Sequence, residues 1–145
     1  MLIINILMIM VACNYIPPRT AYKAARTQCD LKILDSFKVL DFKEEYSHTG
    51  EGFINIVFQL NDNELEALVE DCKENKYKKI SIDNLIKDGF LYENPEYGMS
   101  LYNRNIREIT NGYYRLTARD IKKMDFGITV LDVSKKELII YVSIP

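Results

Sequence analysis

Between residues 53 and 74 the chain changes from an alternating apolar pattern to a helical one. In the first part every second residue is apolar, as in a strand with one buried face: Ile54, Ile56, Phe58 and Leu60. In the second part the apolar residues are spaced by three or four, which places them on one face of a helix: Leu65, Leu68, Val69 and Cys72. This stretch predicts a strand that leads directly into an amphipathic helix.

The junction between strand and helix carries the signals of a helix N-terminus. The Asn61 side chain can accept hydrogen bonds from free N–H groups of the first turn. Glu64, three residues later, can accept from the Asn61 N–H, as in a capping box. Acidic residues begin the segment and lysines end it, which suits the helix dipole. We therefore expect the helix to run from Asp62 to Glu74.

Four other stretches predict strands, namely residues 36–46, 113–117, 126–133 and 138–144. The first changes its apolar side between Val39 and Leu40, which is typical of a bulge. The last is apolar on both sides, as in a central strand. The expected fold class is α+β: a mainly antiparallel sheet of about five strands in the order ββα-loop-βββ, with the helix packed on one face.

Size and composition indicate one globular domain. The chain has 145 residues, of which 48% are hydrophobic and 28% charged, which argues against disorder. The net charge is -2, so the basic field that nucleic-acid binding requires is missing. His48 is the single histidine, and metal sites or general bases built on imidazole are largely excluded. We expect no metal, no cofactor and no nucleic-acid partner.

The stretch from Leu2 to Ala12 is apolar except for Asn5. It is shorter than the roughly 20 residues of a membrane-spanning helix but fits the roughly 7–15 residues of a signal-peptide core. It ends in Met10-Val11-Ala12-Cys13, which resembles the lipobox of bacterial lipoproteins. The resemblance implies cleavage before Cys13 and acylation of that cysteine. Two or three acyl chains hold a protein on a membrane stably, where one does not.

This resemblance divides the chain into three parts. Residues 1–12 would be the signal peptide, residues 13–30 the acylated N-terminus and a tether, and residues 31–145 a single α+β domain. Pro17-Pro18 favours extended geometry in the tether, although residues 21–26 can form a short helical turn. The alternative is that residues 2–12 form a buried segment of a cytoplasmic domain.

The other two cysteines are Cys29 and Cys72. If Cys13 is acylated and the chain is exported, these two can form a disulfide that joins the tether to the helix. The alternative is that Cys72 is a small buried hydrophobe on the apolar face of the helix. No arrangement of cysteine and histidine indicates a cysteine nucleophile.

Residues 90–111 have no clear period and are rich in tyrosine. Long irregular segments are often functional, and tyrosines make good contact surfaces. Tyr92, Tyr97 and Tyr102 are therefore candidates for contact with a partner protein. The alternative is that these rings only pack onto the core.

The chain contains no nucleophile elbow, zinc motif, dinucleotide fingerprint or calcium loop, so no catalytic residue is assigned. We expect a lipid-anchored protein of the bacterial cell envelope whose domain binds a protein or an envelope component without catalysis. One alternative is an immunity protein that neutralises a toxin arriving in the envelope. Another is a small hydrolase that uses two carboxylates in a cleft.

Overall fold

The computed structural model describes residues 19–91, 100–102 and 104–145. The predictions for the signal peptide, for Cys13 and for Tyr92 and Tyr97 fall on residues outside these ranges.

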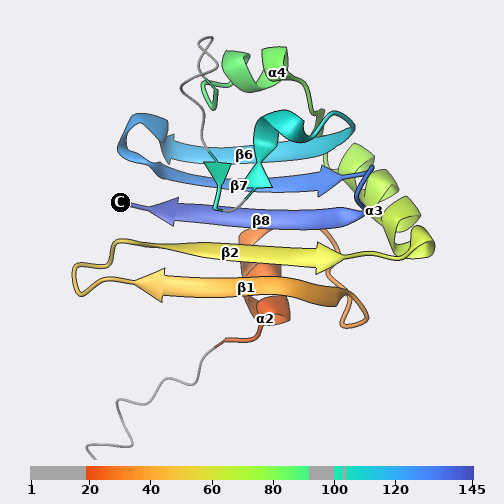
Figure 1. Cartoon of the computed structure of the whole chain (residues 1–145), viewed down its shortest axis with the longest axis horizontal. Coiled ribbons are helices and arrows are strands. Elements are labelled where there is room, and N and C mark those ends of the chain that lie inside the picture. Colours follow the sequence, from red (N-terminus) through yellow and green to blue (C-terminus); the bar gives the residue numbers. More distant parts are fainter. Residues whose placement is uncertain (1–18, 92–99, 103) are drawn as a thin grey trace, which may run out of the picture.

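An antiparallel sheet of six strands organises the described part of the chain (Figure 1). Its spatial order is β1 (Lys38–Tyr46), β2 (Gly52–Gln59), β8 (Glu137–Ile144), β7 (Asp125–Asp132), β6 (Gly112–Asp120) and β3 (Lys78–Lys79). A separate hairpin pairs β4 (Ser100–Leu101) with β5 (Arg104–Asn105). The expectation of a mainly antiparallel α+β fold is confirmed.

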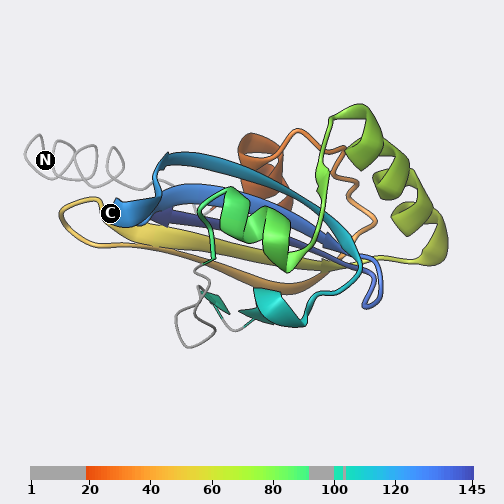
Figure 2. The ribbon, with the colours of Figure 1, turned by 90° about the horizontal axis from the view of Figure 1, so that it is seen from above.

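Helices lie on both sides of this sheet. They are α2 (Ala21–Gln28), α3 (Asp62–Glu74) and α4 (Ile82–Lys87), with the 3-10 turns η1 (Ile106–Glu108) and η2 (Ile121–Lys123). Figure 2 shows α2 and α3 on one side, which we call the back face, and the β4–β5 hairpin and η1 on the other, the front face. α3 begins with the predicted capping box: Asn61 Oδ1 accepts from the Glu64 N–H, and Glu64 Oε2 accepts from the Asn61 N–H, both at 2.9 Å.

Each face of the sheet carries its own hydrophobic core. The back core lies under α2 and α3 and includes Phe37, Ile54, Phe58, Leu68 and Ile140. The front core lies under α4, the hairpin and η1 and includes Leu85, Phe90, Leu101, Phe126 and Ile139. β8 contributes to both cores and lies between β2 and β7, so the expectation of a central strand is confirmed.

The structure corrects the predicted number and order of elements. Its main sheet has six described strands instead of five, and three described α-helices replace the single one expected. The additional elements β3, α2 and α4 have two, eight and six residues, too short for a clear period. The bulge is as expected, because the pairing of β1 with β2 shifts between Val39 and Asp41.

The segment that was expected to be a tether up to residue 30 differs in the structure. Residues 21–28 form α2, and Ala21, Ala24 and Ala25 are buried in the back core. Thr20 caps this helix by accepting from the Lys23 N–H at 3.2 Å. The folded domain therefore includes α2, and the described part of the chain contains no free tether between residues 19 and 30.

Candidate functional site

A groove of about 490 Å³ opens on the back face, beside the C-terminal end of α2. We call it the back groove. Its size falls within the roughly 300–1,000 Å³ that is usual for small-molecule sites. One wall is the chain from Thr27 to Asp30, and Tyr77 also lines it. Its floor is the part of β6, β7 and β8 that α2 and α3 leave uncovered, on the upper half of the sheet in Figure 1.

The floor has a hollow at its centre because β7 carries a glycine there. Thr117 of β6 pairs with Gly127 of β7, and Gly127 pairs with Val142 of β8. A Cβ added to Gly127 would find its nearest neighbour, Val142 Cγ2, at 3.7 Å. The backbone there does not require glycine, so a side chain is missing where one would fit. Glycine inside a strand often marks the close approach of a ligand or another backbone.

Arg115 lies on β6 at one end of the hollow and is held from three sides. Its Nη1 is ion-paired with Asp30 of the α2 wall and lies 3.4 Å from the Asn75 carbonyl oxygen. Its guanidinium carbon is 5.9 Å from the centre of the Tyr77 ring, a favourable cation–π arrangement. The Tyr77 hydroxyl donates to the other Asp30 oxygen at 2.8 Å. These contacts fix the orientation of the guanidinium.

A second arginine–aspartate pair lies on the other side of the hollow. Arg119 Nε of β6 donates to Asp125 Oδ1 at 3.0 Å, and Arg119 Nη2 is ion-paired with the same oxygen at 2.8 Å. The Asp125 side chain is largely buried, whereas that of Arg119 is 75% exposed. The back groove thus contains two arginines and two aspartates, and their formal charges cancel.

Cys29 lines the back groove, and Cys72 is buried in the back core. In the described part of the chain both are free thiols. Burial raises the pKa of Cys29 to about 11 and that of Cys72 to about 12. Both thiols are therefore protonated at neutral pH, which is unfavourable for a nucleophile. Their pairing in an oxidising compartment stays a prediction.

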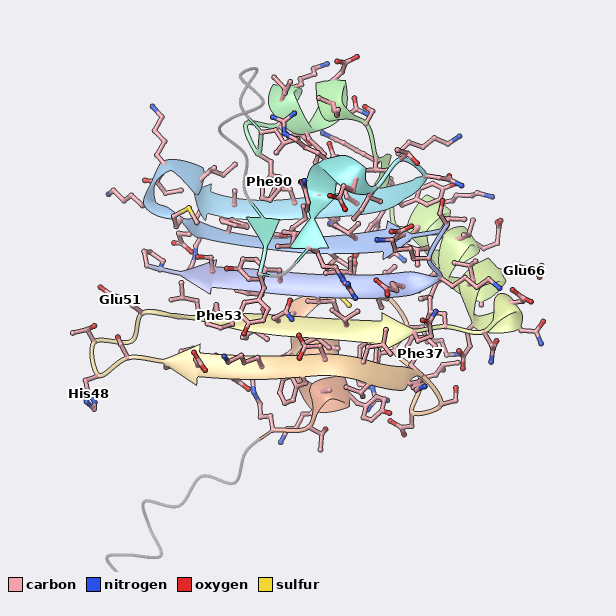
Figure 3. The ribbon with its side chains drawn as sticks, in the orientation of Figure 1. Phe37, His48, Glu51, Phe53, Glu66 and Phe90 are labelled. Atoms are coloured by element: carbon pink, nitrogen blue, oxygen red, sulfur yellow. The ribbon has the colours of Figure 1, made fainter. Side chains whose placement is uncertain are left out.

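Tyr102, the one predicted contact residue among those described, lies on the front face. Its ring stacks on Phe53 at 5.2 Å between centroids, and its hydroxyl accepts from Lys43 Nζ at 3.0 Å. It begins a row of aromatic contacts that crosses the sheet through Phe53, Tyr141 and Phe126 to Phe90. Figure 3 labels Phe53 on β2 and Phe90 beside α4. Tyr102 is thus packed, yet 41% of it remains exposed.

A smaller cavity of about 80 Å³ lies on the front face between β5, η1 and the start of β8. Arg104 Nη2 donates to Glu137 Oε1 there at 3.2 Å, while Arg104 Nε and Glu137 Oε2 are buried without a hydrogen-bond partner among the described residues. The volume suits about two water molecules. We regard it as part of the contact that holds the hairpin on the sheet.

Within residues 19–91, 100–102 and 104–145, no group of three or more His, Cys, Asp or Glu side chains is arranged to hold a metal ion. In the same ranges no helix has the length and apolar character needed to cross a bilayer. His48 is exposed in the β1–β2 loop, as Figure 3 shows. Comparison with protein-family models, with curated proteins and with solved structures found no match to this chain.

The residues of the back groove were not identified from the sequence. Two signals were present: a glycine near the start of a predicted strand, and Arg115, Thr117 and Arg119 at alternate positions. The predicted strand stopped at residue 117, whereas β6 continues to Asp120. Its polar face was therefore not recognised as the floor of a site.

Proposed function

We propose that this protein is a non-catalytic binding domain that holds an envelope component in the back groove, and that acylated Cys13 anchors it to a bacterial membrane. The proposed membrane location depends on the lipobox-like sequence that ends at Cys13. The binding role depends on the groove. The two parts of the proposal are independent, and each has its own test.

The observation that supports binding is that the charged side chains of the back groove are paired with one another. Asp30 is paired with Arg115, and Asp125 with Arg119. The nearby thiol, Cys29, has a pKa of about 11 because it is partly buried. The groove thus combines a preformed hollow with groups that are fixed in place and already neutralised, which suits recognition.

The hydrolase alternative receives less support from this geometry. Two catalytic carboxylates need environments that separate their pKa values, so that one donates a proton while the other stays ionised. Asp30 and Asp125 are instead each ion-paired with an arginine of β6, and this arrangement does not assign the two carboxylates distinct catalytic roles.

Binding in the groove can be tested by screening a fragment library of mixed chemistry against the ¹⁵N-labelled whole chain. We expect hits to shift the Gly127 amide and its neighbours on β6 and β8. A Gly127→Val variant, which fills the hollow, should lose those hits. Fragments that bind only elsewhere, or that bind equally to the variant, would refute the groove as the binding site.

The anchor can be tested by labelling cells with a palmitate analogue and by mass spectrometry of the mature N-terminus. The wild-type protein should take up the label and begin at a modified Cys13. A Cys13→Ser variant should stay unlabelled. An unlabelled wild-type protein, or a labelled variant, would remove the membrane anchor from the proposal and leave the binding role intact.

A further inference from the structure

Several hydrogen-bonding groups of the back groove have no partner among the described residues. Their chemistry indicates which class of ligand the groove can bind. A guanidinium carries five N–H donors in a rigid plane. Arg115 uses only Nη1 for the contacts with Asp30 and Asn75. Its Nε and Nη2 donate to no other described residue, so one edge of the plane, with two parallel N–H groups, is available. Because Asp30 and Tyr77 already fix this plane, the edge is presented at little entropic cost.

Hydrogen-bond acceptors without a partner lie on the other side of the hollow from Arg115. Asp125 Oδ1 accepts a hydrogen bond from Arg119 Nε and is ion-paired with Arg119 Nη2, and Oδ2 has no hydrogen-bond donor among the described residues. The Thr117 hydroxyl stands beside the hollow and can both donate and accept. Gln28 on the α2 wall carries a side-chain amide, which can both donate and accept hydrogen bonds. Donors and acceptors therefore alternate around the same space.

The charge of the back groove limits which ligand these groups can hold. Two arginines and two aspartates cancel, and the C-terminal end of α2 adds a partial negative charge. An anion would meet Asp30 and Asp125, and a cation would meet Arg115 and Arg119. A charge brought into a partly buried site without an ionic partner is costly. A neutral ligand with several groups that both donate and accept avoids that cost.

We infer that the back groove binds a neutral carbohydrate of one or two sugar rings, with two adjacent hydroxyl groups on the Nε–Nη2 edge of Arg115 and one ring over Gly127. This inference rests on the proposed function and gives it a ligand class. Each sugar hydroxyl both donates and accepts, so adjacent hydroxyls match the parallel N–H groups and the free Asp125 oxygen. Val142, which is only partly buried, supplies an apolar contact for the C–H groups of the ring.

The test uses one sugar ring in three charge states. The ¹⁵N-labelled whole chain is titrated with N-acetylglucosamine, glucosamine and glucuronate at constant ionic strength, and a blocked dialanine peptide serves as the neutral non-sugar. The Gly127 amide and the Arg115 Nε–H signals are followed. We expect N-acetylglucosamine to shift both signals saturably, with an affinity several-fold above those of the charged sugars and of the peptide.

Matched variants identify the groups that act. Arg115→Lys keeps the charge but loses the two-donor edge and should weaken N-acetylglucosamine binding by about tenfold or more. Thr117→Val keeps the shape of an exposed side chain and should weaken it several-fold. Arg26→Lys alters an arginine of α2 outside the groove that pairs with Asp35, and it should bind like the wild type.

The inference is wrong if a charged sugar or the peptide binds the groove more tightly than N-acetylglucosamine. It is also wrong if the sugar leaves the Arg115 and Gly127 signals unchanged while library fragments shift them. In both cases the binding role of the groove would survive. If neither sugars nor fragments perturb the groove, the proposed function fails with it.

Discussion

The two halves of the back face differ, and β2 and β7 show the difference. β2 directs Ile54, Ile56 and Phe58 to the back, where α2 and α3 cover them. β7 places Asp125, Gly127 and Thr129 at its alternate back positions, beside the back groove. On the front the same strand contributes only apolar residues to the core: Phe126, Ile128 and Val130.

One part of the back face is therefore covered by helices, and the other part is left open as the floor of the back groove. A strand whose polar side chains share one face marks where the protein leaves the sheet open. A strand whose apolar side chains share that face marks where helices must pack. The boundary between them runs beside β8, whose Ile140 belongs to the back core and also lines the groove. The candidate site thus lies where the hydrophobic cover ends.

The largest expected effect is the loss of packing in the covered half. Phe58 is fully buried and contacts Tyr22 and Phe37 at 5.6 and 5.8 Å between ring centroids. Phe58→Ala should lower the free energy of unfolding by about 3–5 kcal/mol. Phe53 of the same strand, on the front, is only partly buried, and Phe53→Ala should cost about 1–2 kcal/mol. Urea unfolding measures both; equal losses would contradict the comparison.

The next effect concerns the thiols of the back face. At pH 8 a thiol with a pKa of about 11, such as Cys29, is about one part in a thousand ionised, against about one in ten at the ordinary value of 9.0. Iodoacetamide should therefore modify Cys29 in the native protein about a hundredfold more slowly than in the urea-unfolded protein. Site-resolved mass spectrometry provides the rates.

Two outcomes of the alkylation experiment carry different meanings. Rapid modification of native Cys29 would show that the thiol is neither buried nor protonated as described. If Cys29 and Cys72 react in urea only after reduction of an exported sample, they form the disulfide that the sequence suggested.

A third prediction concerns how much two carboxylates, one on the front side and one on the back, contribute to stability. Asp88 accepts from Lys78 Nζ at 2.7 Å and from the hydroxyl of the buried Tyr114 at 2.8 Å. These contacts, Lys78 first, hold the pKa of Asp88 below its usual value of 3.8. A lowered folded-state pKa adds stability that is complete above the unfolded pKa and is lost as the pH falls through the folded value.

Asp88→Asn should therefore cost about 1–2 kcal/mol at pH 7, and the difference from wild type should vanish towards pH 2. On the back, Arg19 lowers the pKa of Glu44. Glu44→Gln should cost less than about 1 kcal/mol, because no buried group loses its partner. Thermal unfolding across this pH range measures both. A difference for Asp88→Asn that does not change with pH would contradict the electrostatic origin.

The local features of this fold were predictable, and the long-range ones were not. The capping box at Asn61 and the bulge beside Val39 depend on a few neighbouring residues, and the sequence shows them directly. α2 was underestimated because its buried face consists of alanines, Ala21, Ala24 and Ala25, whose apolar character is weak. Small residues give little periodic signal even where they pack closely.

The back groove depends on contacts between residues that are far apart in sequence. Asp30 and Arg115, which define its polar end, are 85 residues apart. Their meeting requires the register of three strands and the docking of α2, neither of which a local pattern encodes. Gly127 and the alternation of Arg115, Thr117 and Arg119 were local signals, but neither says which face of the sheet is open.

The smallest expected effect tests whether the hollow is left empty for a reason other than stability. A Cβ at Gly127 would have no neighbour closer than 3.7 Å, whereas one at Gly112 of β6 would lie 2.0 Å from the Leu131 carbonyl oxygen. Gly127→Ala should therefore stabilise the protein by about 0.4–1 kcal/mol, because it restricts the unfolded chain. Gly112→Ala should destabilise it by about 1–3 kcal/mol, as urea unfolding can measure. A Gly127→Ala variant that is more stable but binds N-acetylglucosamine less tightly would show that the glycine serves the site. If Gly127→Ala destabilises the fold, the glycine serves packing instead.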